Sequence, residues 1–289
     1  MSVFAKEGRK REKEKILSLL GSMVSNSQNA ITNFGAPKSR QPLYDALYES
    51  FSKALAAAKP GSDTQLILLR GLISISSYST QGEDLCRDIA RGAFEDTVGD
   101  IADATGIPYD QNLGWSALGT LAGRNLVTVA DLDRAAQYNP SSISKNGYAY
   151  AIAAIPDADH KAAAYKRIME DSSLSNDALT STANGFLRGD VGLRTPYYKP
   201  FFDSLLSMWD TRSIGMATRI VRGLYPRSLY NYGSAEGTGV SDNPSVALAQ
   251  EWLRKNPSAP SALRRLILEA QDNAHRNMIG QQFNSSLSD

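Results

Sequence analysis

The sequence predicts an all-α protein, a curved solenoid of antiparallel helix pairs of the HEAT or armadillo kind. Apolar residues recur at helical spacing along nearly all of the 289 residues, and no stretch shows the period-two alternation of a half-buried strand. Gly, Pro, Asn and Asp interrupt this pattern about every 20 residues, so two helices and their turns take roughly 40, the period of such repeats. Because no residue motif recurs, a compact helical bundle stays open as the alternative.

Apolar stripes and prolines mark the first helices. Residues 16–24 carry apolar side chains on one face of a helix, and residues 43–55 repeat the pattern. Pro37 and Pro42 bracket a predicted break between the two stripes, because proline removes a backbone donor that a helix interior needs.

Turns punctuate the rest of the chain. In a Pro-Gly-Ser-Asp turn, Ser62 or Asp63 is predicted to cap the helix that follows by accepting bonds from its first free amides. Residues 230–245, rich in Gly and Ser, are predicted to form a surface loop. The loop lacks the Gly-Lys-Ser/Thr ending of a phosphate-binding loop, so nucleotide binding is not expected there.

Composition and charge exclude several classes of protein. The net charge of +1 argues against a nucleic-acid binder built on bulk basic charge. No stretch approaches the roughly 20 apolar residues of a membrane helix, so no membrane partner is expected. The lone cysteine, Cys86, shares a helical apolar face with Leu85 and Ile89 and is predicted to be a small buried hydrophobe. One cysteine without an internal partner fits a reducing, cytoplasmic compartment.

No reaction centre is predicted in this chain. Its two histidines, His160 and His275, have neither a second histidine at one-turn spacing nor an adjacent glutamate. The G-x-S-x-G elbow of serine hydrolases is absent as well. We therefore expect no catalytic residue, no metal ligand and no cofactor in these 289 residues.

Arginines are concentrated in the stretch from 209 to 227. On a helical wheel that treats it as one helix, Arg212, Arg219 and Arg222 share a face with Gly215 and Gly223, opposite an apolar face. Glycine is costly in a helix, so this pair suggests a close backbone approach. The guanidinium fork suits a carboxylate or a phosphate. Two interpretations stay open: a solvated face with ion pairs to a neighbouring helix, or a face that binds a ligand.

Five blocks, in conserved order and spacing, resemble one known family. The chain is similar to the C-terminal helical domain of aminopeptidase N in the zinc aminopeptidase (gluzincin) family, especially its actinobacterial branch. The blocks are AAAKPGSDTQLILLRG (56–71), NLGWSALGTLAGRNLV (112–127), DHKAAAYKRIMEDSSLSNDALTSTANGF (159–186), YKPFFDSLLSMWDTRSIGMATRIVRGLYPR (198–227) and WLRKNPSAPSALRRLILEAQDN (252–273). The resemblance covers the helical domain at 10–280. Residues 1–9 are expected to form a flexible N-terminal segment, and residues 281–289 a frayed tail.

The resemblance implies a non-catalytic role. In such enzymes an upstream catalytic domain carries the H-E-x-x-H motif and the zinc, and the C-terminal domain caps the active site and shapes a peptide chamber. Since this chain lacks that motif, we expect it to be inactive alone, with the peptide substrate and the upstream catalytic domain as its partners. The alternative is a free-standing helical-repeat scaffold that binds a protein or peptide.

Within the family reading, the arginine face gains a specific candidate role. Arg212, Arg219 and Arg222 could bind the carboxylate at the peptide's C-terminus in bidentate fashion. Arg188 and Arg194, in the segment FLRGDVGLRTP, are the weaker candidates.

Overall fold

The computed structural model describes residues 3–94, 110–226 and 239–287, with side chains from residue 14 onward. Within these ranges the chain forms thirteen α-helices and no strand, which confirms the all-α prediction. The helices are α1 (Val3–Phe34), α2 (Pro37–Ala57), α3 (Asp63–Ile75), α4 (Glu83–Arg91), α6 (Gln111–Gly123), α7 (Val129–Tyr138), α8 (Ser142–Ala154), α9 (Ala158–Glu170), α10 (Asn176–Phe186), α11 (Tyr198–Thr211), α12 (Ile214–Leu224), α13 (Pro244–Lys255) and α14 (Ser261–Ser286).

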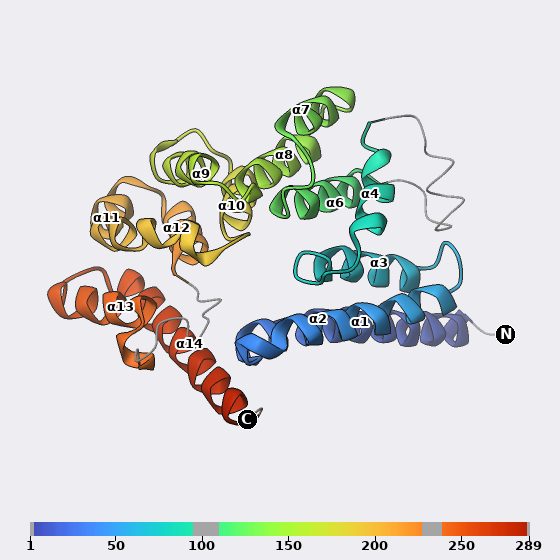
Figure 1. Cartoon of the computed structure of the whole chain (residues 1–289), viewed down its shortest axis with the longest axis horizontal. Coiled ribbons are helices and arrows are strands. Elements are labelled where there is room, and N and C mark those ends of the chain that lie inside the picture. The colour runs from blue at the N-terminus through green and yellow to red at the C-terminus, as the bar shows by residue number, and fades with distance from the viewer. Residues whose placement is uncertain (1–2, 95–109, 227–238, 288–289) are drawn as a thin grey trace.

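The helices form two concentric rows (Figure 1). The inner row is α3, α6, α8, α10, α12 and α14, and each of these helices contacts the next. The outer row is α2, α4, α7, α9, α11 and α13, and each packs on the inner helix that follows it in the chain. The fold is therefore a curved solenoid rather than a compact bundle.

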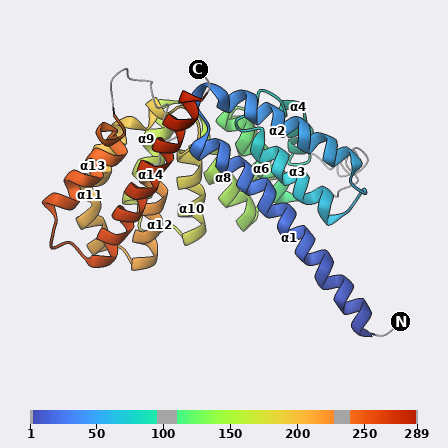
Figure 2. The ribbon, with the colours of Figure 1, turned by 90° about the horizontal axis from the view of Figure 1, so that it is seen from below.

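The first and last helices meet and close the curve into a ring. Helix α1 packs on both α3 and α14. The side-chain amides of Gln281 and Asn284 donate 2.8 Å hydrogen bonds to the carbonyls of Asn33 and Phe34, which α1 itself leaves without partners. Seen from below, α14 ends beside the turn between α1 and α2, and the two long helices diverge from that point (Figure 2).

Ring closure changes what was expected at both ends of the domain. Residues 281–286 are helical and Gln281 is fully buried, so the prediction of a frayed tail is wrong for this part. The reason is that α1 supplies acceptors for the amides of the last turns, which no local pattern reveals. Helix α1 begins at Val3, so residues 3–9 are helical too.

Local sequence signals account for most helix boundaries. The hydroxyl of Ser62 accepts a 3.2 Å bond from the amide of Gln65, as predicted for the cap of α3. Of the two prolines, only Pro37 marks a break, since Pro42 lies inside α2. Of the predicted loop at 230–245, residues 230–238 lie outside the described residues, and α13 already begins at Pro244.

Two apolar clusters form the core and meet at α8. One joins α3, α4, α6 and α7 to α8, and the other joins α8 to the helices from α9 to α14. Glycines let α8 lie close to both neighbours in the inner row. A Cβ on Gly119 would lie 2.1 Å from the Tyr150 ring, and one on Gly185 would lie 2.2 Å from the Tyr150 carbonyl oxygen. This close packing fixes Tyr150 at the centre of the concave face.

Candidate functional site

The concave side of the ring contains a cavity of about 1160 Å³. Its lining residues come from α1 and from every helix of the inner row, together with the loops after α3 and α10. We call this cavity the chamber. Because the inner helices present one face each to it, residues far apart in the sequence meet there.

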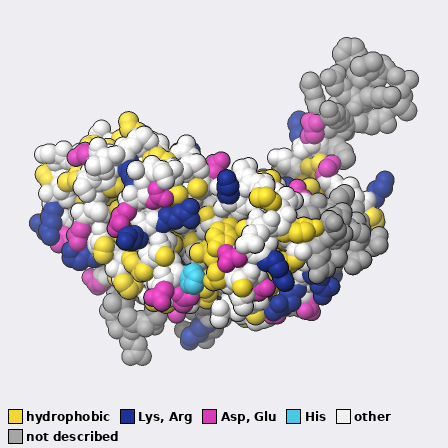
Figure 3. All heavy atoms as spheres, turned by 90° about the horizontal axis from the view of Figure 1, so that it is seen from above, with side chains coloured by type: hydrophobic (Ala, Val, Ile, Leu, Met, Phe, Trp, Pro, Cys, Tyr) yellow, Lys and Arg dark blue, Asp and Glu magenta, His cyan; other side chains and the backbone are white. Residues whose placement is uncertain are grey.

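The charges that line the chamber are strongly biased to one sign. Of the residues that the structure describes, four arginines line it, Arg70, Arg188, Arg194 and Arg222, against a single acidic residue, Glu269. The carboxylate of Glu269 pairs with Arg265 at 2.7 Å. On the face seen from above, by contrast, basic and acidic side chains are interspersed (Figure 3). The chamber is therefore a positive region in a chain whose net charge is only +1.

Arg188 is held by two tyrosines rather than by an acid. Its Nε donates a 2.7 Å hydrogen bond to the hydroxyl of Tyr150, and its Nη1 donates one of 2.7 Å to the hydroxyl of Tyr78. The guanidinium carbon lies 5.3 Å from the centre of the Tyr78 ring and 5.8 Å from that of the Tyr150 ring, a cation–π arrangement. Among the described residues, no carboxylate pairs with Arg188. Neutral phenols fix its position and leave its charge available to an anion.

Tyr78 lies in the loop between α3 and α4, and α2 holds that loop. The ring of Tyr44 stacks on Tyr78 with centres 4.9 Å apart and an angle of 17°. Burial raises the pKa of Tyr44 to about 12, so its phenol stays neutral. The next residue, Asp45, accepts 2.5 Å and 2.9 Å hydrogen bonds from the hydroxyl of Ser79 and the amide of Thr80. Adjacent residues of α2 thus fix adjacent residues of the loop.

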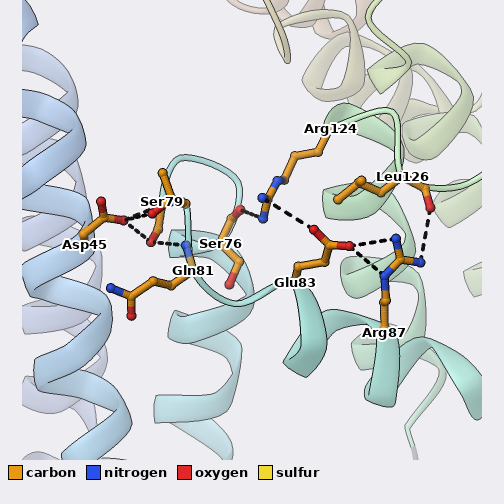
Figure 4. A network of polar contacts seen from close by, with 9 residues as sticks. Asp45, Ser76, Ser79, Gln81, Glu83, Arg87, Arg124 and Leu126 are labelled. Atoms are coloured by element: carbon orange, nitrogen blue, oxygen red, sulfur yellow. Dashed lines mark hydrogen bonds and ion pairs between the residues drawn. The ribbon is translucent and has the colours of Figure 1, made fainter.

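Arginines fix the same loop from its other side (Figure 4). Arg124 donates a 3.3 Å bond to the carbonyl of Ser76 and lies 4.0 Å from the carboxylate of Glu83. Arg87 completes the network with a 2.8 Å contact to Glu83 and a bond to the carbonyl of Leu126. The network links the loop to α4 and to the end of α6, and so stabilises the position of Tyr78.

A buried lysine lies behind the chamber wall. The Nζ of Lys161 donates to the carbonyls of Ala153 at 2.6 Å and Gly185 at 3.2 Å, which joins the end of α8 to α10. Burial, with the positive charge of Arg194 next in importance, lowers the pKa of Lys161 to about 7. Lys161 is not among the predicted site residues, although its spacing from Ala164 and Ile168 places it on an apolar helix face.

The structure does not form the predicted face of three arginines. Helix α11 ends at Thr211, Arg212 is extended with φ −108° and ψ 154°, and Ser213 caps the start of α12. One helical wheel therefore cannot include Arg212. Its guanidinium instead donates to the carbonyls of Asp171 at 3.0 Å and Met169 at 2.7 Å, at the end of the outer helix α9.

The other predicted residues fall on both sides of the chamber wall. Arg222 lines the chamber, whereas Arg219 is exposed elsewhere and donates a 3.0 Å bond to the carbonyl of Gly215. Arg188 and Arg194, the weaker candidates, both line it. Arg194 is 2% exposed and donates to the carbonyl of Leu187. The structure therefore brings together Arg188, Arg194 and Arg222 but not Arg212 or Arg219.

The expected close approach at the two glycines holds for one of them. A Cβ on Gly223 would lie 2.7 Å from the Cβ of Ala183, where α12 packs on α10. At Gly215 the nearest atom would be the Arg219 guanidinium at 3.5 Å, an ordinary contact. Nothing in the structure explains Gly215.

Asparagines form the largest group of lining residues that were not predicted from the sequence. Seven of the fourteen asparagines that the structure describes line the chamber. They come from five helices: Asn29, Asn33, Asn112, Asn146, Asn184, Asn273 and Asn277. Their signal in the sequence is that each falls inside a helical pattern, where asparagine is a poor residue.

The thiol of Cys86 and the imidazole of His160 are each accounted for by their local packing or helix cap. Cys86 is fully buried as predicted, and burial raises the pKa of its thiol to about 11. His160 lies 2.6 Å from the carboxylate of Asp157, the residue that caps α9. In the described ranges no cluster of three or more His, Cys, Asp or Glu side chains could hold a metal ion. Nor does any described helix combine the length and apolar character needed to cross a membrane.

Comparison with known proteins identifies the family. The chain matches the ERAP1-like C-terminal domain over residues 10–276. It is also 25% identical over 279 residues to a protein of Streptomyces lividans named aminopeptidase N. That alignment covers 96% of this chain and 30% of the relative, so the chain spans about a third of the relative's length. Because this match covers nearly the whole chain, the chain belongs to the ERAP1-like C-terminal domain family.

Proposed function

We propose that this chain is the non-catalytic domain of a zinc-dependent aminopeptidase N, where it caps the active site and walls the chamber that receives the peptide. Family membership and the name of the relative support this reading. The observation that supports it most directly is the chamber itself, which has a volume of about 1160 Å³ and is lined by residues from all inner helices. A cavity of this size can hold several residues of an extended peptide.

The zinc and the peptide-bond chemistry belong, in this proposal, to the rest of the enzyme. The catalytic part would contact this domain and would remove N-terminal residues from the peptide. We place the complex in the cytoplasm, because a chain with the single buried thiol of Cys86 suits a reducing compartment.

The part of this domain is to hold the far end of the peptide. Arg188 is the strongest candidate to bind the C-terminal carboxylate, because two tyrosine hydroxyls orient it and no described acid neutralises it. Arg222 and Arg194 line the same space and would add positive charge. Arg212 and Arg219 are not part of this proposal.

The test compares peptides in the complete enzyme, with this domain joined to or combined with its catalytic part. Two decapeptides of one sequence are used, one with a free C-terminal carboxylate and one with a C-terminal amide. Substitution Arg188→Ala should raise KM for the free acid about tenfold or more, the usual effect of losing a charged hydrogen bond, and leave the amide unchanged. Arg219→Ala is the matched control and should change neither value.

Two results would contradict the proposal. The purified chain alone should release no residue from aminoacyl-amide substrates, so zinc-dependent turnover by this chain would show that it has its own reaction centre. If KM were equal for both decapeptides, in the wild-type enzyme and in Arg188→Ala, the chamber would have no part in substrate binding. That second result would favour the free-standing scaffold.

A further inference from the structure

Among the described residues, most side-chain amides of the chamber make no hydrogen bond; the exception is one pair, in which Asn277 donates a 3.3 Å bond to the Oδ1 of Asn33. Within the described part of the chain, no hydrogen bond ties the side-chain amides of Asn29, Asn112, Asn146, Asn184 or Asn273. Four of the five are exposed to the cavity, and Asn146 is half-buried. Five amides without partners therefore face one space from α1, α6, α8, α10 and α14.

Outside the chamber, four of the described asparagines meet local backbone needs, although Asn26 and Asn284 lie inside α1 and α14. Asn125 adopts a positive φ of 58° in a turn, Asn139 and Asn256 end helices, and Asn243 caps α13. Those are the positions that asparagine prefers. Inside a helix it is less favourable than alanine, so its repeated use on the chamber face works against helix stability. A function of the amide group itself would explain this placement.

An asparagine amide matches the chemistry of a peptide group. It offers both donors and an acceptor, which is what the N–H and C=O of a peptide bond need when water is displaced. An extended peptide has no internal hydrogen bonds, and burying its backbone groups without partners is costly. Asparagine amides on five helices could supply hydrogen-bond partners along the backbone of the bound peptide, whatever side chains that peptide carries.

The arginines add selection by charge. No carboxylate of the described residues pairs with Arg70, Arg188 or Arg222. The one acid found to line the chamber in the described part of the chain, Glu269, is paired with Arg265. A lysine or arginine side chain entering the chamber would meet like charge, whereas an aspartate or glutamate would meet opposite charge.

We propose that the chamber holds its peptide by the backbone, through these side-chain amides, and selects peptides by charge, accepting acidic and neutral segments and rejecting basic ones. The inference rests on the proposed function in taking a peptide as the ligand, and it adds how that peptide is recognised. Recognition through the backbone explains the asparagines, and the excess of arginine explains the selection.

The experiment titrates the purified chain with fluorescein-labelled decapeptides of alanine and serine. One is neutral and unmodified, a second carries two central glutamates, and a third carries two central lysines. The fourth is the neutral peptide N-methylated at alternate backbone amides. The glutamate peptide should bind at least tenfold more tightly than the lysine peptide at low salt, and the difference should shrink in 1 M salt. N-methylation should weaken binding about tenfold, because it removes backbone donors.

Variants of the chain test the amides directly. The double change Asn146→Ala/Asn184→Ala should weaken binding of the neutral peptide about tenfold. Asn26→Ala is the matched control, since Asn26 is an exposed residue of α1 that does not line the chamber. The double variant should unfold at an equal or higher urea concentration, because alanine favours the helix. Weaker binding with undiminished stability excludes misfolding as the cause.

The outcomes separate this inference from the proposed function. The inference would be overturned if the affinity for the peptides were unchanged by N-methylation, by the two asparagine substitutions and by the central charges. If Arg188→Ala still raised KM for free-acid peptides in the complete enzyme, the proposed function would stand. An absence of peptide binding up to millimolar concentration would also overturn the inference, as would equally tight binding of a single-stranded oligonucleotide. The proposed function is judged separately, by KM.

Discussion

The Nη1 of Arg188 and the hydroxyl of Tyr78 lie 2.7 Å apart, although 110 residues separate them in the chain. The contact joins the end of α10 to the loop between α3 and α4, across two intervening helices of the inner row. A hydrogen bond to a phenol orients the guanidinium without neutralising it. The geometry of the chamber and its charge are therefore set by the same contact.

Removing the Tyr78 hydroxyl should weaken the hold on Arg188. In the complete enzyme, Tyr78→Phe is expected to raise KM for a free-acid decapeptide severalfold, since one net hydrogen bond contributes about 0.5–1.5 kcal/mol. The amidated decapeptide should be unaffected. Tyr148→Phe serves as the control, because the hydroxyl of Tyr148 bonds to Asp133 outside the chamber. An equal effect on both decapeptides would show that Tyr78 acts on the fold instead.

Stability should rise with pH because of Lys161. Its pKa is about 7 in the folded chain, and near 10.4 in an unfolded one. Between these values the unfolded chain binds a proton that the folded chain has released, so the free energy of unfolding increases with pH. The slope is at most about 1.4 kcal/mol per pH unit. Urea unfolding at pH 7.5 and pH 9 should show this increase in the wild type and less of it in Lys161→Met. Parallel pH profiles would contradict it.

Two glycine substitutions should change the stability of the folded chain in opposite directions. Gly185→Ala would place a Cβ 2.2 Å from the carbonyl oxygen of Tyr150, and we expect a loss of about 1–3 kcal/mol from such overpacking. Gly21→Ala adds a Cβ that meets nothing within 4 Å, and should gain up to about 1 kcal/mol of helix stability. Urea denaturation of the two variants measures both. A neutral Gly185→Ala would mean that α8 and α10 can separate without cost.

Cys86 should be inert in the folded chain. Its side chain is fully buried and its pKa is raised to about 11, so little thiolate forms at pH 8. An aromatic disulfide reagent should react with it at least a hundredfold more slowly than in 6 M guanidinium chloride. Fast labelling of the native chain would show that α4 opens locally.

The sequence predicted the helices because their signals are local. Apolar spacing, turn residues and caps such as Ser62 depend on a few neighbouring positions, and the structure confirms them. Ring closure could not be predicted in the same way. The bonds from Gln281 and Asn284 to α1 join residues about 250 positions apart, and neither partner carries a local sign of the other.

The prediction of a face with three arginines is wrong for an identifiable reason. The wheel assumed a continuous helix through Arg212, but the Ser213 hydroxyl accepts a 3.3 Å bond from the amide of Met216 and starts a new helix there. Serine before a run of apolar residues is a cap signal that the wheel ignored. The two tyrosines that hold Arg188 come from α8 and from the loop after α3, and the sequence does not place them beside it.

Closure of the ring has a consequence for how the domain unfolds. In an open repeat array each unit contacts only its neighbours, so the end units detach first and cooperativity is limited. Here the units at both ends hold each other through Asn33, Phe34, Gln281 and Asn284. Detaching one end breaks contacts of the other, which couples local opening at either end to the whole array. The domain should therefore melt as a single cooperative unit, without the early loss of terminal helices that open solenoids show.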